Sequence, residues 1–344
     1  MAQYRLLMNT LVAWAAGTKA SPITLASYPV LDPTRLIERT QMIAGSELVG
    51  AEHPGRSLAG ARMAQIEFGC RLTDSPTDDA PYHGAPLRAC GMSEALGGTT
   101  PNIAYLYTAS RNLHLVDENT PGDTDPLDIY INEDGEQRGL LDCVGNVVFS
   151  ADPENALLAR FSMMGLLDDG IADATTCGAE ETAAAALTEP NTPIAAYGQG
   201  ITVQIASASA LTDLVIRQWE INLNRAAKVT KDTNGTFGYS RPYLGSQTAA
   251  PTLTFPVLRR ELTNYNWYNA LLNGDKITFK GIHNPDGGMG KTITYGFRGY
   301  LSQDPNPTEI DGDAVVTLTL QQSLTAADAF YIGWKSTTDH SYPF

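Results

Sequence analysis

Short runs in which apolar and polar side chains alternate, each ending in turn residues, recur along the whole sequence. Residues 63–72 are an example, with apolar side chains at every second position from Ala64 to Leu72. Successive side chains of a β-strand point to opposite faces of a sheet, so this pattern predicts half-buried strands. The sequence therefore predicts a mainly β fold.

The clearest group of strands lies in the first half of the chain. Three strand-like runs follow one another there, at residues 127–131, 138–150 and 157–166. Asp134-Gly135 separates the first two runs, and the turn residues 152–155 separate the second from the third. Because Asp-Gly between two alternating runs is a strong hairpin signal, these segments predict an antiparallel meander.

The second half repeats this arrangement. Its strand-like runs lie at residues 202–206, 213–224, 251–258, 276–282, 291–301 and 314–322. Each half also has one short helical segment. The first covers residues 86–90, and the second begins at Thr263 or Asn264 and ends at Gly274. The apolar contacts of the two helices are expected from Leu87, Cys90 and Leu96, and from Trp267, Tyr268 and Leu271. The repeated order of strands and helix predicts an architectural duplication.

Breaks in these patterns suggest the domain boundaries. Residues 1–55 contain several prolines and are interpreted as an extended N-terminal arm and loops that lie on a neighbouring subunit. The stretch 168–191 has no lysine or arginine and is interpreted as a surface loop, with an alanine-rich helix over 180–187 as the alternative. The predicted parts are therefore residues 1–55, 56–170, 171–198, 199–323 and 324–344, which are the arm, the first β domain, the linker, the second β domain and a C-terminal extension.

Charge and cysteine content limit the possible functions. The net charge is −15, from 38 acidic and 23 basic residues, so binding of nucleic acid through a basic groove is not expected. The four cysteines have no CxxC spacing and are expected to be buried or neutral thiols formed in a reducing compartment. No apolar run approaches the roughly 20 residues that span a bilayer. Residues 11–16 could be mistaken for part of a signal sequence, but synthesis in the cytosol is the expectation.

Candidate chemical motifs fail on spacing or context. Residues 287–292 resemble the end of a phosphate-binding loop, but Pro285 stands where that loop needs glycine, and a strand follows instead of a helix. The aspartate pairs at 123/125 and 311/313 lack the distal glutamate of a calcium loop and are expected to form turns.

The histidines and tryptophans also favour structural roles. The five histidines, at positions 53, 83, 114, 283 and 340, lack metal-pair spacing and are expected to be at the surface or hydrogen-bonded. The four tryptophans are expected to anchor the core. A carboxylate pair in a cleft stays open. No catalytic, cofactor-binding or metal-binding residue is predicted, and the chain is expected to be structural and not an enzyme.

The order of the segments resembles that of the major tail tube proteins of long-tailed, siphovirus-like bacteriophages. The segments that carry the resemblance are residues 60–68, 85–92, 127–135, 141–149, 160–166 and 265–280. Together they extend the resemblance over roughly residues 10–322. The sequence departs from the family pattern at Gly139-Leu140 and at residues 143–146, and the segment after Ser323 has no counterpart.

The resemblance implies two β-sandwich or partial-barrel domains, each with a short flanking α-helix. It implies rings that stack into a hollow tube, with strand edges of adjacent subunits joined into an inner barrel. Three two-domain chains would imitate a sixfold ring, and a hexamer is the alternative. The implied partners are other copies of the chain, a tape measure protein and tail terminator or tip proteins. No cofactor and no membrane are implied.

The implied location is the virion tail, with assembly in the host bacterial cytoplasm. DNA would pass through the lumen without specific binding, and the acidic composition predicts a wall that repels phosphate. Two other functions remain as alternatives. One is another virion component, such as a tail hub, adaptor or decoration protein. The other is a β-sandwich glycan-binding or hydrolase module.

Overall fold

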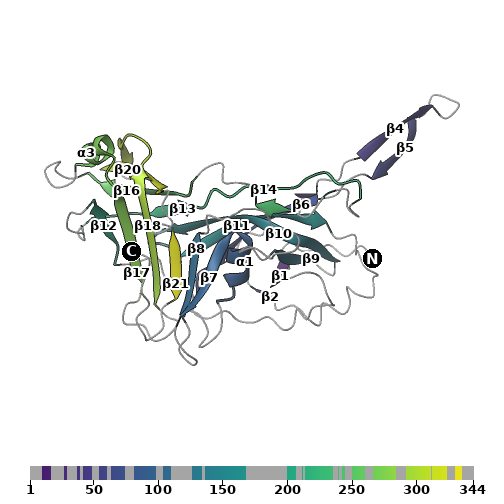
Figure 1. Ribbon diagram of the computed structural model, residues 1–344, viewed down its shortest axis with the longest axis horizontal. Coiled ribbons are helices and arrows are strands. Elements are labelled where there is room, and N and C mark those ends of the chain that lie inside the picture. The colour runs from purple at the N-terminus through teal and green to yellow at the C-terminus, as the bar shows by residue number, and fades with distance from the viewer. Residues whose placement is uncertain are drawn as a thin grey trace.

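The computed structural model describes part of the chain. The described residues are 10–16, 27–28, 37–38, 42–48, 54–59, 63–73, 81–97, 104–109, 126–133, 136–167, 200–206, 211, 214–234, 239, 242–244, 250–259, 266–283, 292–310, 312–323 and 330–334. They form a mainly β structure with two short helices (Figure 1). The predicted mainly β class is confirmed.

The first half of the chain contains helix α1 (Gly84–Ala89). Its strands are β1 (Thr10–Ala16), β2 (Ser27–Tyr28), β3 (Ile37–Glu38), β4 (Met42–Leu48), β5 (Pro54–Ala59), β6 (Met63–Arg71), β7 (Met92–Gly97), β8 (Ala104–Ala109), β9 (Leu127–Glu133), β10 (Glu136–Ala151) and β11 (Leu158–Leu167).

The second half contains helix α3 (Trp267–Asn273). Its strands are β12 (Thr202–Ile205), β13 (Trp219–Asn222), β14 (Ala227–Lys228), β15 (Tyr243–Leu244), β16 (Thr252–Leu258), β17 (Ile277–His283), β18 (Ile293–Leu301), β19 (Asn306–Ile310), β20 (Asp313–Gln322) and β21 (Tyr331–Trp334).

One long layer of strands crosses both halves of the chain. Its order is β3–β6–β11–β10–β13–β16–β20–β19, and every neighbouring pair is antiparallel. The predicted meander of β9, β10 and β11 is confirmed. The halves meet where Val148–Ala151 of β10 pair with Trp219–Asn222 of β13. Figure 1 shows β6, β10, β11 and β13 running along the long axis of the molecule.

The alternation in the sequence explains the two faces of this layer. One row of side chains, opposed strand by strand, faces the core. It consists of Cys70, Ala159, Phe149, Ile221, Leu253 and Leu320, all buried. Burial of a large apolar side chain contributes about 1.5–3 kcal/mol, so this row is a main source of stability for the layer. The buried side chains of both halves belong to one cluster.

A second set of strands covers the other side of the core. Strand β21 pairs with β8 of the first half along one edge and with β18 of the second half along the other. The neighbours continue to β7 and to β17 and β12. The tryptophans at positions 14, 219, 267 and 334 are all buried, as the sequence predicted. Residues 330–334, which lie within the predicted extension 324–344, thus provide an integral strand, because Phe330, Ile332 and Trp334 belong to the buried core cluster.

Strand order repeats between the halves. The unit β3–β6–β11–β10 of the first half corresponds to the unit β13–β16–β20–β19 of the second half. In both units every neighbouring pair of strands is antiparallel. Helix α1 follows β6 in the first unit as α3 follows β16 in the second. A two-stranded hairpin, β4–β5 or β14–β15, lies between the first two strands of each unit. The division into two separate domains at the predicted boundaries stays a prediction.

Several local predictions need correction. Strand β1 lies inside the predicted arm but pairs with β9 along its whole length and buries Val12 and Trp14. Only residues 219–222 of the expected strand 213–224 form a regular strand. Helix α3 begins after Asn266, whose side chain caps it by accepting from the Asn269 N–H, 3.0 Å away.

The expected helix contacts were partly wrong. Leu87 and Cys90 are buried, but Leu96 is 62% exposed because it lies on β7. In α3, Trp267 is buried, whereas Tyr268 is 43% exposed. Three of the four cysteines, at positions 70, 90 and 143, are free and buried as predicted, and Cys177 lies outside the described residues.

Candidate functional site

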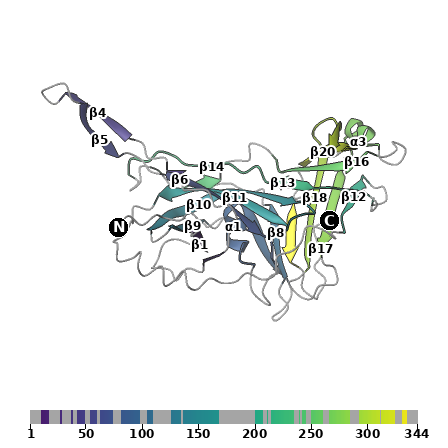
Figure 2. The ribbon, with the colours of Figure 1, turned by 180° about the vertical axis from the view of Figure 1, so that it is seen from behind.

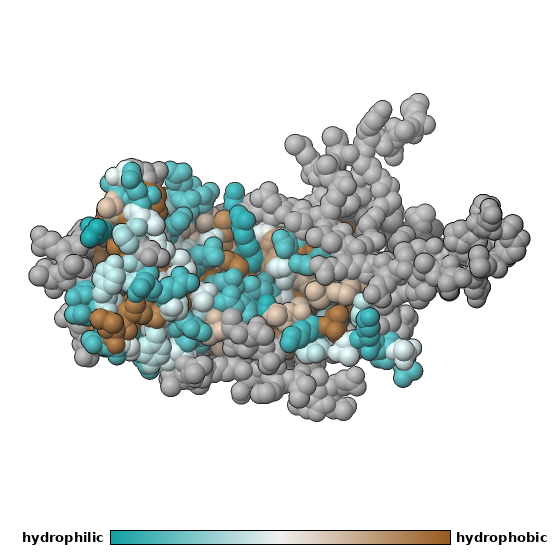
Figure 3. Space-filling view, turned by 90° about the horizontal axis from the view of Figure 1, so that it is seen from above, coloured by the Kyte–Doolittle hydropathy of each residue, from teal (hydrophilic) through white to brown (hydrophobic). Residues whose placement is uncertain are grey.

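The outer side of the long layer is a polar face that extends across both halves. It is defined by the outward residues Glu67, Gly69, Arg71, Asn146, Val148, Ser150, Leu158, Arg160, Ser162, Glu220, Asn222, Thr252, Thr254, Thr319 and Gln321, which oppose one another in cross-strand rows. Seen from above, the surface over β10, β11 and β13 is largely hydrophilic (Figure 3). The face is therefore a wide surface of hydroxyl, amide and charged groups.

Hydrogen bonds fix the side chains of the polar face where the strands meet. Gln65 Nε2 donates to Ser162 Oγ at 3.1 Å, and Ser162 Oγ donates to Glu67 Oε1 at 3.4 Å. At the junction of the halves, Asn146 Nδ2 donates to Asn222 Oδ1 at 2.9 Å. These bonds link neighbouring strands and so hold the face in one arrangement.

The junction of the halves is also stabilised by the chain that follows β13. The Arg225 N–H donates to Asn146 Oδ1 at 2.9 Å, and the Leu223 N–H donates to the Val147 carbonyl at 3.2 Å. Burial lowers the pKa of Arg225 to about 10, so its guanidinium stays charged at neutral pH. Asn146 thus binds both strand β13 and the segment that follows β13.

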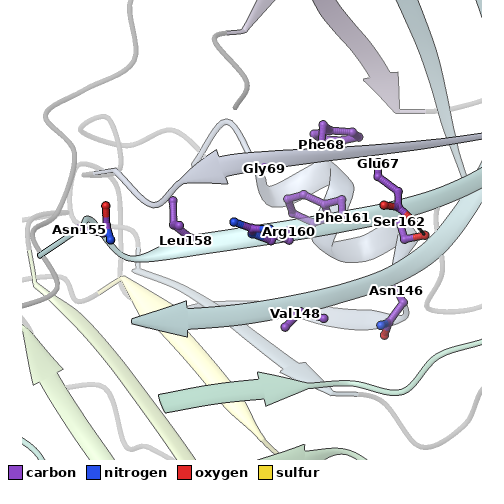
Figure 4. Close-up of a pocket in the computed structure, with 10 residues that line it drawn as sticks. All are labelled: Glu67, Phe68, Gly69, Asn146, Val148, Asn155, Leu158, Arg160, Phe161 and Ser162. Atoms are coloured by element: carbon purple, nitrogen blue, oxygen red, sulfur yellow. Dashed lines mark hydrogen bonds between the residues drawn. The ribbon is translucent and has the colours of Figure 1, made fainter. Parts of the chain in front are cut away.

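A hollow of about 580 Å³ lies on the polar face over β6, β11 and β10. Figure 4 shows the carboxylate of Glu67, the guanidinium of Arg160 and the amide of Asn146 around it. Among the described residues that line this hollow, Glu67 is the only carboxylate, and there is no histidine or cysteine.

His83 was expected to be at the surface or hydrogen-bonded, and this expectation is wrong. It is fully buried, and neither ring nitrogen has a hydrogen-bond partner among the described residues. Its ring packs against Tyr82 and Trp334, with centroids 4.9 and 4.8 Å away. Burial without a partner lowers the pKa of His83 to about 3, so the ring is neutral at physiological pH. The sequence held no signal for this, since the ring is enclosed by a residue 251 positions away.

Of the other candidate motifs, the structure describes only single residues. Asp313 at the start of β20 forms an ion pair with Arg217, so this aspartate has a structural partner. Thr292 precedes β18, in line with the predicted strand, whereas residues 123–125 and 284–291 lie outside the described residues, as do His53, His114 and His340.

Clusters of metal-binding side chains and membrane-spanning helices are both absent from the described part of the chain. No group of three or more histidine, cysteine, aspartate or glutamate side chains there could hold a metal ion. None of its helices is both long and apolar enough to cross a membrane.

Comparison with known proteins adds one finding. A family model described as "Phage tail tube protein" matches residues 10–326, which include every element from β1 to β20. No curated protein matches the chain.

Proposed function

The chain belongs to the phage tail tube protein family, and we propose that three copies of it close head to tail into each ring of the tube. As a member of this family, the protein is a structural component of the virion tail that assembles into a tube. The number of chains per ring, the strands that join them and the face that lines the conduit are the proposal. The long-tailed type of phage stays a prediction.

The strand order of the long layer carries this proposal. Among the described residues, β3 pairs only with β6 and β19 only with β20, so these strands end the order. They run in opposite directions, because every step between them is antiparallel. Strand β19 of one copy can therefore pair with β3 of the next, as β10 pairs with β13 inside the chain. Such pairing covers both edges, which isolated proteins must otherwise protect.

The repeat supports three chains per ring. Each chain supplies two successive strand units of the same order, and three chains supply six. A ring with threefold symmetry in its chains would thus have nearly sixfold symmetry in its strands. The junction of β10 with β13, including the bond from Asn146 to Asn222, is the pattern for the junction between copies.

We further propose that the polar face lines the conduit. Its amide and hydroxyl groups, from Asn146 and Ser162 to Thr252 and Gln321, carry no charge that would hold phosphate. Its charged members are Glu67, Arg71, Arg160 and Glu220, so the described charges of the face balance. An acidic wall therefore requires carboxylates outside this set, and the acidic lumen stays a prediction.

Electron microscopy of purified protein tests the proposal. At increasing concentration, we expect rings and tubes whose end-on averages show threefold symmetry with six similar lobes. Native mass spectrometry should then give three chains per ring. Six chains per ring would refute the stoichiometry. A single ring per particle that never stacks would favour a hub or adaptor, and a monomer that stays inert at high concentration with its tail partners would contradict assembly altogether.

A further inference from the structure

Most charged residues of the polar face lie on β6 and β11. These strands run beside β10, away from α3 (Figure 2). Three successive cross-strand pairs of the face contain a charged residue there: Glu67–Ser162, Gly69–Arg160 and Arg71–Leu158. The corresponding strands of the second unit, β16 and β20, have the uncharged pairs Thr252–Gln321 and Thr254–Thr319. The first unit therefore holds a charged site that its repeat lacks.

Two arginines are neighbours in this site. Arg160 opposes Gly69, so Arg71 is its diagonal neighbour, two residues along β6. Diagonal neighbours on one face of a sheet are about 7–8 Å apart, within reach of long side chains. Both arginines are exposed. Two positive charges so close together repel each other, so a negatively charged group between them is stabilised.

Neither arginine has a carboxylate partner among the described residues. Glu67 is also a diagonal neighbour of Arg160, but it accepts a hydrogen bond from Ser162 Oγ at 3.4 Å. In Figure 4 the Arg160 side chain extends toward Leu158 and away from Glu67. Other arginines do form ion pairs, as in Arg88–Glu94 and Arg217–Asp313. The positive charge of Arg71 and Arg160 is thus presented at the surface.

The hollow on the polar face gives a negatively charged group room to reach Arg160. Its volume is about 580 Å³, and Gly69, which opposes Arg160, contributes no side chain to it. A guanidinium donates its N–H groups in a planar fork that fits two oxygens of a phosphate. Phe68 and Phe161 also line the hollow, but both are buried and stack on each other, so they offer no exposed ring to a base. The site therefore fits a phosphate and not a nucleobase.

We propose that Arg71 and Arg160 contact the phosphate backbone of DNA as it moves through the conduit. This inference rests on the proposed function, in which the polar face lines the tube. A DNA strand carries a charge at every nucleotide, so it can neutralise both arginines at once. The contact reads no sequence, because the phosphates of all nucleotides are alike.

The acidic groups around the site keep this contact weak. Glu67 lies beside Arg160 and repels phosphate, and the chain as a whole has a net charge of −15. With three chains per ring, the conduit has one arginine pair per chain, and the uncharged pairs of the second units separate these arginines. DNA is thus contacted at three positions around its axis in each ring and released as it slides.

Salt-dependent DNA binding tests the proposal. The affinity of unassembled protein for a short fluorescent DNA duplex is measured by anisotropy over a series of salt concentrations. Arg160→Gln should weaken binding at low salt roughly two- to fivefold, as expected for an exposed ion pair. It should also lower the slope of log K against log salt concentration by about one, because one phosphate contact is lost. A duplex of unrelated sequence should give the same values, and a strong sequence preference would contradict a contact with phosphate.

Two variants control for charge and position. Arg259→Gln removes an exposed arginine outside the polar face and should bind DNA like wild type. Glu67→Gln keeps an acceptor for Ser162 but removes the negative charge beside Arg160, so it should bind DNA more tightly. Equal losses in Arg160→Gln and Arg259→Gln would show that only net charge matters and would overturn the proposal. If Arg160→Gln is itself unstable, Arg71→Gln replaces it and should show the same loss.

The outcomes separate this inference from the proposed function. If micrographs show tubes and Arg160→Gln binds DNA like wild type, the phosphate site is wrong although the tube function stands. If the protein forms no tubes, or tubes with the polar face on their outer wall, the proposed function fails first. A glutamate peptide of equal charge that binds at Arg160 more tightly than DNA would identify an acidic polypeptide as the partner and overturn the assignment to DNA.

Discussion

The buried, unpaired His83 predicts that the folded chain loses stability in mild acid. Its pKa is lowered from the ordinary 6.5 to about 3, because burial disfavours the charged ring. Below pH 6.5 the unfolded chain takes up a proton that the folded chain cannot accept. The contribution of His83 is therefore fully present above pH 6.5 and is lost as pH falls toward 3. The loss should be about 2 kcal/mol at pH 5 and about 3 kcal/mol at pH 4.

The variant His83→Phe isolates this effect. Phenylalanine keeps the ring contacts with Tyr82 and Trp334 but cannot titrate. The free energy of unfolding is measured by urea denaturation of unassembled protein between pH 7.5 and 4. Carboxylates contribute equally to both proteins, so the difference between wild type and variant should grow by about 2 kcal/mol on going to pH 5. Parallel pH profiles would refute the assignment of His83 as buried and neutral.

Three further substitutions test the packing of the layers, each by thermal and urea denaturation. Gly145→Ala should cost about 1–3 kcal/mol, because its Cβ would overlap the Ser162 carbonyl across the strand pair; wild-type stability would contradict this register. Asn146→Ala should cost about 1–3 kcal/mol by leaving the polar partners at the junction of the halves unpaired, and an unchanged midpoint would show that this junction is not formed in solution. Trp334→Ala should cost about 3–5 kcal/mol, because the indole is buried and its Nε1 donates to the Thr73 carbonyl at 3.0 Å; a small effect would mean that β21 is dispensable.

The pairing at the junction between the halves could not be predicted from the sequence. The strands on both sides were predicted, but their pairing joins Phe149 to Ile221, which are far apart in the sequence. The alternation of apolar and polar residues predicts which side chains share a face of the sheet. It does not predict which strands are neighbours, because every strand edge presents the same backbone hydrogen-bonding groups. The polar face could not be assembled until this pairing was known.

The ends of the chain show the same limit. The prolines that follow Thr10–Ala16 predict an arm, but this segment pairs with β9, and its Val12 and Trp14 side chains are buried. Tyr331–Trp334 is too short for a periodic signal, and its place between β8 and β18 depends on two remote edges. His83 likewise became a buried residue only when Trp334 closed over it.

The sequence by itself determined the β class, most strands, the position of both helices and the resemblance to tail tube proteins, because alternation, turn residues and capping act over a few neighbouring positions. It also indicated the repeat of strands and helix. Only the tertiary structure decided that the two units join through β10 and β13, that β21 lies between β8 and β18, and that His83 is buried. These features depend on which surfaces meet, and contacts between remote segments have no periodic signature in the chain.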